Sequence, residues 1–389
     1  MQNVYVGNRG YFGLKKQVDA TTAIVPTIYI PYYAESMKTI ITKHRQNTVK
    51  GNRMYAQDTH QGLRSHTGEV TVLCEPNTIG YLMDMLLTKS STSGGGPYTH
   101  VFGIGDTENY YTVDIKKGNY VERYVGVKAN SFKPTYVDGV MQASIGLSAL
   151  KTFKVATLSG TPTGVGPYTV ALNTDYDPSP TTGLVVGDIV KVGSVDAIVA
   201  SIPSVSTFTC VADVSAEAAG AQVYIRAATP SFTLLTPFHW GRTEYRFSLV
   251  DAATALSATH TPLDEGTEFS ITHANEADEG AHQTGAYDPT DLRRLTVDGE
   301  VNMTRVFDTL NESEDFMDNN KKALVIRMFA GNTTTYELRI TFNNLKVTEQ
   351  AKDAPTDTIV KIVQKLQPQY DTSDSQGLAV TVINNVSTI

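Results

Sequence analysis

An internal repeat constrains the fold of this chain more strongly than any other feature of its sequence. The heptapeptide VDATTAI begins at Val18, and VDAATAL begins at Val250, 232 positions later. The tripeptide GEV begins at Gly68 and again at Gly299, 231 positions later. Similarity at a nearly constant spacing indicates a repeated structural unit. We therefore expect the front and the back of the chain to share one fold.

The pattern within each copy predicts β-strands and one helix. Stretches such as YYTVDIKKG and YVGVKANSF alternate apolar and polar residues, which is typical of antiparallel strands. Residues 75–89 read EPNTIGYLMDMLLTK, where Pro76 suits the first helical turn and apolar residues recur at helical spacing. In the second copy ESEDFMDNNKK takes this place, with Ser313 as the predicted N-cap of a shorter helix.

Residues 155–228 differ in composition from both copies. They are rich in small residues and contain only eight charged side chains. Short apolar runs at regular spacing, from YTVAL at residue 168 to AQVYIRA at residue 221, predict a small β-barrel or sandwich. This module lies either between the copies or within the end of the first copy. We expect an insertion, because AQVYIRAATP resembles LAVTVINNV, the last predicted strand of the second copy.

The expected fold class is therefore mainly β, with two tandem antiparallel β-sandwich domains and a small inserted β domain. The first sandwich occupies residues 1–154, called the front segment below. The inserted domain occupies residues 155–228, called the insert, and the second sandwich occupies residues 229–389, called the back segment. Each sandwich is predicted to carry one flanking helix.

Composition argues against several classes of protein. The net charge of −8 leaves no basic excess for gripping nucleic-acid phosphates. Two distant cysteines, Cys74 and Cys210, offer neither a disulfide framework nor a zinc cluster. No apolar run approaches the roughly 18 residues of a membrane span. The first residues also lack the apolar core of a signal peptide, so we expect assembly in the cytoplasm.

The best enzymatic candidate in the sequence is weak. His273, Glu276 and His282 could chelate a metal, but a catalytic zinc pair usually needs two His one helical turn apart. No nucleophile elbow or phosphate-binding loop is present. We therefore predict no catalytic residues, no metal site and no cofactor.

Several motifs of the first copy occur in a specific order between residues 20 and 153. VPTIYIPYYAESMK is followed by TGEVTVLCEPNTIGYLMDMLL and then by YVERYVGVKANSF. This order resembles the major tail tube proteins of long-tailed, siphovirus-type bacteriophages. The resemblance implies a virion structural protein whose domains associate edge to edge into rings. The rings would stack into a hollow tail tube through which the DNA is ejected.

The same resemblance implies the partners of the chain. They are further copies of itself, other tail proteins (tape measure, tail terminator and distal tail) and DNA that passes through the lumen without specific binding. No membrane partner is implied, and the expected location is the phage tail, assembled in the host cytoplasm. If the ring of this family has six domain positions and each chain supplies two, three chains complete a pseudo-hexameric ring.

Two polar excursions at equivalent places in the copies carry opposite charge. Residues 35–66 have a net charge of +4 and residues 264–294 a net charge of −6. We predict that these excursions meet at subunit interfaces and set register, since exposed ion pairs add only about 0–1 kcal/mol each. The alternative is that both are simply solvated. The predicted interface residues are Lys38, Lys43, Arg45, Lys50, Arg53, Arg64, Glu268, Glu276, Asp278, Glu279 and Asp288.

A second class of function stays open at this point. Repeated β-sandwiches with a decorating domain also build adhesins and receptor-binding proteins. Electron microscopy separates the two classes, because a tube protein forms rings or hollow filaments and an adhesin forms discrete particles.

Overall fold

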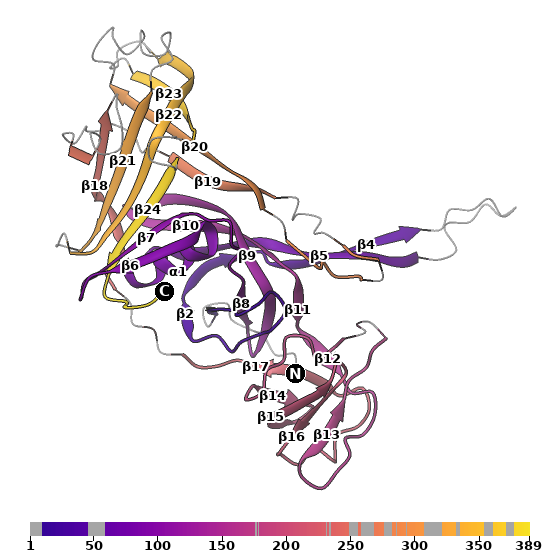
Figure 1. The fold of residues 1–389 in the computed structure, drawn as a ribbon. Helices are drawn as coiled ribbons and strands as arrows, with labels where there is room; N and C mark the ends of the chain where they lie inside the picture. Colours follow the sequence, from indigo (N-terminus) through magenta and orange to yellow (C-terminus); the bar gives the residue numbers. More distant parts are fainter. Residues whose placement is uncertain are drawn as a thin grey trace, which may run out of the picture.

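The computed structural model of the chain is mainly β and contains one long helix, α1 (Figure 1). This confirms the predicted fold class. The structure describes all residues except 1–9, 46–58, 176, 178, 231, 233–234, 249–255, 258–267, 276–281, 285, 293, 307–320, 332–334, 354–360 and 371–376. The helix predicted around Ser313 lies outside the described residues.

The strands divide among the three parts of the chain. The front segment contains β1 (Phe12–Lys16), β2 (Ile28–Ile30), β3 (Tyr32–Glu35), β4 (Lys38–Arg45), β5 (Thr59–Leu73), β6 (Thr88–Ser93), β7 (Tyr98–Ile104), β8 (Tyr111–Lys117), β9 (Tyr120–Val137), β10 (Val140–Ala149) and β11 (Lys151–Phe153). The insert contains β12 (Val155–Thr157), β13 (Tyr168–Ala171), β14 (Ile189–Val192), β15 (Val195–Ser204), β16 (Thr207–Cys210) and β17 (Gln222–Arg226). The back segment contains β18 (Phe238–Ser248), β19 (Glu268–Asn275), β20 (Arg294–Val306), β21 (Lys322–Ala330), β22 (Glu337–Asp353), β23 (Lys361–Pro368) and β24 (Leu378–Asn384).

The front and back segments pair their strands in the same order. In the front segment β1 pairs with β8, β8 with β9, β9 with β10, β10 with β5, and β5 with β3 and β4. In the back segment β18 pairs with β21, β21 with β22, β22 with β23, β23 with β20, and β20 with β19. All of these pairs are antiparallel. In this scheme β19 occupies the place of β3 and β4, and β22 occupies the place of β9.

One sheet runs through both segments. The end of β9 pairs with β19, with Phe132 opposite Ile271 and Ser131 opposite Thr272. The resulting order is β4–β5–β10–β9–β19–β20–β23–β22, with four strands from each segment. A different set of strands closes on itself. Because Val140 of β10 bridges to His239 of β18, the strands β9, β19, β20, β23, β22, β21, β18 and β10 form an 8-strand closed barrel.

The two segments also share one hydrophobic core. Its buried side chains come from both, and the ring of Phe269 lies 6.4 Å from that of Phe132 and 6.5 Å from that of Phe342. The last strand, β24, pairs with β7 of the front segment. The segments are therefore packed against each other as well as hydrogen-bonded.

Helix α1 (Pro76–Leu87) forms where the helical spacing predicts it. Pro76 at its start needs no N–H partner there, and the chain leaves the helix at Thr88, whose φ of 68° lies in the left-handed region. Its apolar residues are almost completely buried, and it also buries a carboxylate, Asp84. Lys16 donates to Asp84 at 2.8 Å, and Tyr111 donates to the same oxygen, so the charge is compensated inside the core.

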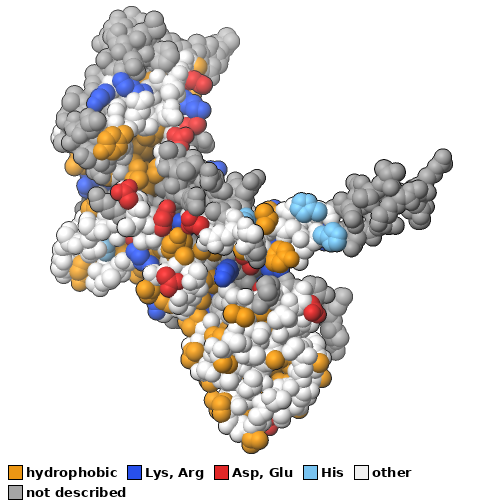
Figure 2. Space-filling view, turned by 45° about the vertical axis from the view of Figure 1, so that its right-hand side comes forward, with side chains coloured by type: hydrophobic (Ala, Val, Ile, Leu, Met, Phe, Trp, Pro, Cys, Tyr) orange, Lys and Arg blue, Asp and Glu red, His pale blue; other side chains and the backbone are white. Residues whose placement is uncertain are grey.

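The insert interrupts the last strand of the front segment. β11 pairs with β9 from Val125 to Arg123, and β17 continues along β9 at Val121 and Tyr120. In the back segment β24 runs along β22 without interruption. The strands predicted at YTVAL, GDIVKVG, DAIVASI, TFTCVA and AQVYIRA correspond to β13, β14, β15, β16 and β17. Figure 2 shows the insert as a separate lobe whose visible surface has few charged side chains.

A buried ion cluster connects the insert to the front segment. The guanidinium of Arg123 in β9 contacts Asp114 of β8 at 2.7 Å and Asp188 of the insert at 2.6 Å. It also donates to the carbonyl oxygen of Gly183 at 3.1 Å. Burial opposes the charge of Arg123, but the two carboxylates outweigh this effect and raise the pKa of the guanidinium. These bonds fix where the insert sits.

Candidate assembly surfaces

Among the described residues, no strand pairs with the outer edge at either end of the sheet that runs through both segments. β4 pairs with β5 on one side, and no described strand pairs with its other side. At the opposite end, the part of β22 beyond Leu345 pairs with β23, and no described strand covers its other side. An exposed strand edge presents free N–H and C=O groups and is a template for pairing with another chain.

The β9–β19 joint shows how two such edges meet in this molecule. Phe132 and Ile271 face each other across the joint and are almost completely buried. In the matching order of strands, β19 corresponds to β3 and β4, and β9 corresponds to β22. The joint therefore pairs the equivalent of β4 with the equivalent of β22. The chain therefore contains one example of the contact that its two free edges could make.

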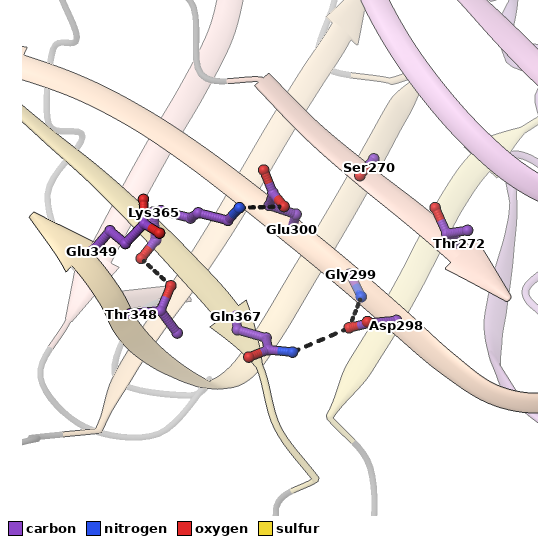
Figure 3. A pocket seen from close by; sticks show the side chains of 9 residues that line it. All are labelled: Ser270, Thr272, Asp298, Gly299, Glu300, Thr348, Glu349, Lys365 and Gln367. Atoms are coloured by element: carbon purple, nitrogen blue, oxygen red, sulfur yellow. Dashed lines mark hydrogen bonds and ion pairs between the residues drawn. The ribbon is translucent and has the colours of Figure 1, made fainter. Parts of the chain in front are cut away.

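One face of the back half of this sheet forms a polar hollow of about 570 Å³ (Figure 3). Four neighbouring strands line it, and buried residues such as Ile271 and Leu366 alternate with the lining residues, so the hollow lies on the face away from the core. Its lining consists of Ser270, Thr272, Asp298, Gly299, Glu300, Thr348, Glu349, Lys365 and Gln367.

The charges of the polar hollow are mostly compensated by neighbours. Lys365 contacts Glu300 at 3.0 Å, and Gln367 donates to Asp298 at 3.4 Å. The hydrogen bond from Lys365 lowers the pKa of Glu300. Three carboxylates face one ammonium, so the hollow is weakly acidic. Exposed polar groups of this kind suit a hydrated wall, because they keep their contact with water.

The back segment also sends residues 286–292, called the docked segment, onto the front segment. The backbone N–H of Arg64 in β5 donates to the carbonyl oxygen of Tyr287 at 2.8 Å, and the guanidinium lies over the Tyr287 ring at 5.9 Å. Lys128 donates to the carbonyl oxygen of Leu292. The Leu292 side chain is 1% exposed and packs with Leu150.

Asp288 of the docked segment is the centre of a small ionic contact. His66, whose side chain is 1% exposed, lies 3.3 Å from Asp288, and Arg64 lies 3.7 Å from the same oxygen. Partial burial acts to raise the pKa of Asp288, but the hydrogen bond with His66 and the neighbouring cations outweigh it and leave the pKa below its ordinary value. The other ring nitrogen of His66 contacts Thr39 at 3.0 Å.

Residues 7–236 match the model of a family described as phage tail tube protein. The match covers more than half of the chain. The chain belongs to the phage tail tube protein family. No curated protein matches it. The sequence resemblance is thereby confirmed at the level of the family, and the chain has a structural role in the tail of the virion. The matched span of this tail tube chain includes the insert and ends just before β18.

The structure brings together one pair among the predicted interface residues of this tail tube chain. Arg64 and Asp288 meet within one chain. Lys38 and Lys43 lie in β4, the strand with the free edge. The structure gives the backbone of Arg45 and Glu268 in their strands but does not describe their side chains. Lys50, Arg53, Glu276, Asp278 and Glu279 lie outside the described residues.

Sequence reasoning missed the residues that hold the docked segment. His66, Lys128 and Leu292 each look unremarkable in sequence, because the contact of His66 with Asp288 spans 222 positions and that of Lys128 with Leu292 spans 164. Within the described residues, no group of three metal-binding side chains is present. The helices among those residues include none that is long and apolar enough to cross a membrane.

Proposed function

We propose that this chain polymerises as stacked rings into the hollow tail tube, with three chains in each pseudo-hexameric ring. The β9–β19 joint carries the proposal. Pairing β22 of one chain with β4 of the next would repeat the joint that already connects the two segments. A head-to-tail contact of this kind closes a ring when its rotation allows it. Closure would also remove both free edges.

In this arrangement the two segments of each chain are equivalent positions of one circular wall. The matching order of strand pairs supports this equivalence, as does the repeat of GEV at Gly68 and Gly299. We infer that the segments arose by duplication of one tube domain. We further infer that the chain is not an enzyme and that its partners are other copies of itself and the other proteins of the tail, with assembly in the host cytoplasm.

The polar hollow supports a position of the sheet around the lumen. The repeated glutamates, Glu69 and Glu300, both lie on this polar face, where Glu69 accepts a hydrogen bond from Ser144 and Glu300 contacts Lys365. Phosphates are repelled by carboxylates, so DNA would pass such a wall without binding to it. The core side of the same sheet would hold the ring together through apolar burial.

Electron microscopy of the purified chain tests the ring. We expect rings or hollow tubes whose averaged cross-section contains six similar domains and three copies of the insert. Six full chains in each ring would contradict the trimeric arrangement. Discrete particles without rings would contradict the tube itself and favour the adhesin alternative.

Charge reversal tests the lumen. Tubes are assembled from the double variant Glu69→Lys with Glu300→Lys and mixed with a short DNA duplex. On gel filtration the duplex should elute together with these tubes, whereas it should elute separately from unmodified tubes. Asp175→Lys in the insert is the matched control, because this aspartate is exposed and belongs to a part of the fold separate from the polar face. Equal retention by the control and the double variant would show that the polar face does not line the lumen.

A further inference from the structure

We propose that an apolar groove in the back segment is the receptor for the β4–β5 arm of a second copy of this chain. The arm is β4 together with the part of β5 that pairs with it, residues 59–67. The groove has a volume of about 310 Å³, and most of its lining is apolar: Ile104 of β7, Val297, Phe342, Pro368, Tyr370 and Leu378. Asp298 and Gln369 are the polar side chains of the lining. This inference rests on the ring proposed above and assigns a specific contact within it.

The groove lies where the front segment already has an occupant. In the front segment, β10 ends opposite His66, and the docked segment takes over the edge of β5 at Arg64. In the back segment, β23 leaves β20 after the pair of Val301 with Leu366, and the groove opens at Val297. Because β20 and β23 stand where β5 and β10 stand, the two sites are equivalent. No described segment of the chain fills the second one.

The occupied site shows which part of a neighbour fills its counterpart. The docked segment belongs to the excursion between β19 and β20, and β19 is the strand that crosses to the front segment at the β9–β19 joint. The equivalent excursion in the front segment lies between β4 and β5. Suppose that β4 of a first chain pairs with β22 of a second chain, as β19 pairs with β9 within one chain. The arm of the first chain would then reach the groove of the second chain, just as the docked segment reaches β5.

The arm exposes the apolar side chains that such a groove requires. Ile40, Ile41 and Leu63 are 45%, 40% and 48% exposed, respectively. Figure 2 shows hydrophobic side chains on the visible face of the arm. Leu292, which anchors the docked segment, is 1% exposed, whereas Leu63 is 48% exposed. Leu63 is therefore an apolar side chain that a second chain could bury.

The two sites differ in chemistry, which determines their occupants. His66 stands two positions before Gly68, and Val297 stands two positions before Gly299. The front site thus presents an imidazole and a guanidinium to Asp288, whereas the groove presents an aliphatic side chain at the corresponding place. No cationic side chain is among the described residues that line the groove, so a carboxylate there would lose water without gaining an ionic partner. The groove accordingly selects the apolar arm over the acidic docked segment.

Cross-linking of assembled tubes tests this contact. The variant Leu63→Cys and the variant Tyr370→Cys are mixed, assembled and oxidised. Both positions are exposed, so a disulfide can form between them if they meet. The native Cys74 and Cys210 are buried. We expect covalent dimers in several-fold excess over each single variant alone. The matched control replaces Tyr370→Cys with Val186→Cys, at an exposed position in the insert, and should give no excess.

The outcomes separate this inference from the ring itself. Rings that form normally but give no more dimer than the control overturn the groove and leave the ring intact. Absence of rings from the unmodified chain overturns both. As a second readout, Tyr370→Glu should reduce assembly at least tenfold while the unassembled chain keeps its unfolding midpoint, because Tyr370 is 65% exposed. Normal assembly of Tyr370→Glu would also overturn the proposal.

Discussion

The front and back segments share one order of strand pairing, yet they differ in what is attached to it. The last strand of the front segment is split by the insert, whereas β24 in the back segment is continuous and pairs with β7. The site on the front segment is charged and holds the docked segment, whereas the equivalent groove of the back segment is mostly apolar and no described residue fills it. Two segments with the same order of strands can therefore carry different surfaces. The register of a sheet depends on the alternation of buried and exposed residues and on backbone hydrogen bonds more than on any one exposed side chain.

In the ring that we propose, this difference would give the chains a defined order. If both docking sites were alike, a neighbour could meet either segment with similar affinity. One ionic site and one apolar site would discriminate between the two occupants. The acidic docked segment would lose its hydration in the apolar groove, and the apolar arm would find no apolar contact at the ionic site. The predictions below test this contrast, from the largest expected effect to the smallest.

The ion cluster of Arg123 connects the insert to the front segment, and its loss should have the largest effect. Arg123→Ala leaves Asp114 and Asp188 buried without their cation, and the free energy of unfolding should fall by about 3–5 kcal/mol. Urea unfolding measures the change. Arg226→Ala, which removes an exposed pair with Asp196, is the control and should cost about 0–1 kcal/mol. Similar losses in both variants would show that the cluster does not hold the insert.

The two anchor leucines should behave differently before assembly. Leu292→Ala removes a buried side chain and should lower the free energy of unfolding of the unassembled chain by about 2–5 kcal/mol. Leu63→Ala should change this stability by less than about 0.5 kcal/mol, because Leu63 is half exposed. Its effect should appear instead as slower tube formation in light scattering. A large loss of stability in Leu63→Ala would mean that the anchor is already buried within one chain.

The ionic site should make the docked segment sensitive to acid. The pKa of Asp288 is below its ordinary value of 3.8 in the folded chain, so its stabilising contribution is complete above that value and is lost as the pH falls through the lower folded-state pKa. We expect Asp288→Asn to cost about 1 kcal/mol near pH 7 and less below pH 3. Unfolding curves at several pH values measure this. A constant difference between the variant and the unmodified chain across that range would contradict the contribution.

The exposed charges of the two excursions should have the smallest effect per residue. Reversal of Lys43, Arg45, Lys50 and Arg53 to Glu should slow assembly at low ionic strength, with about 0–1 kcal/mol for each residue. The difference should shrink at 1 M salt, where the screening length is about 3 Å. Light scattering measures the rates, and replacement by Gln separates loss of charge from reversal. Unchanged rates in the Glu variant would indicate that both excursions are simply solvated.

Part of this fold was accessible from sequence because periodicity reports which face of an element is buried. The helical spacing after Pro76 predicted α1, and the alternating runs between residues 168 and 226 predicted the strands of the insert. The residues that meet across the chain were less accessible. Asp288 was named among the interface residues, but its contact with His66, 222 positions away, leaves no local pattern.

The sequence alone determined the mainly β class, the position of α1 and the likeness to tail tube proteins, because these depend on the order and period of neighbouring residues. Only the tertiary structure showed that β9 meets β19, that the insert splits one strand and that the docked segment fills one of two similar sites while no described segment fills the other. Those features depend on which distant strands share an edge, and strand pairing is decided by the packing of the whole chain.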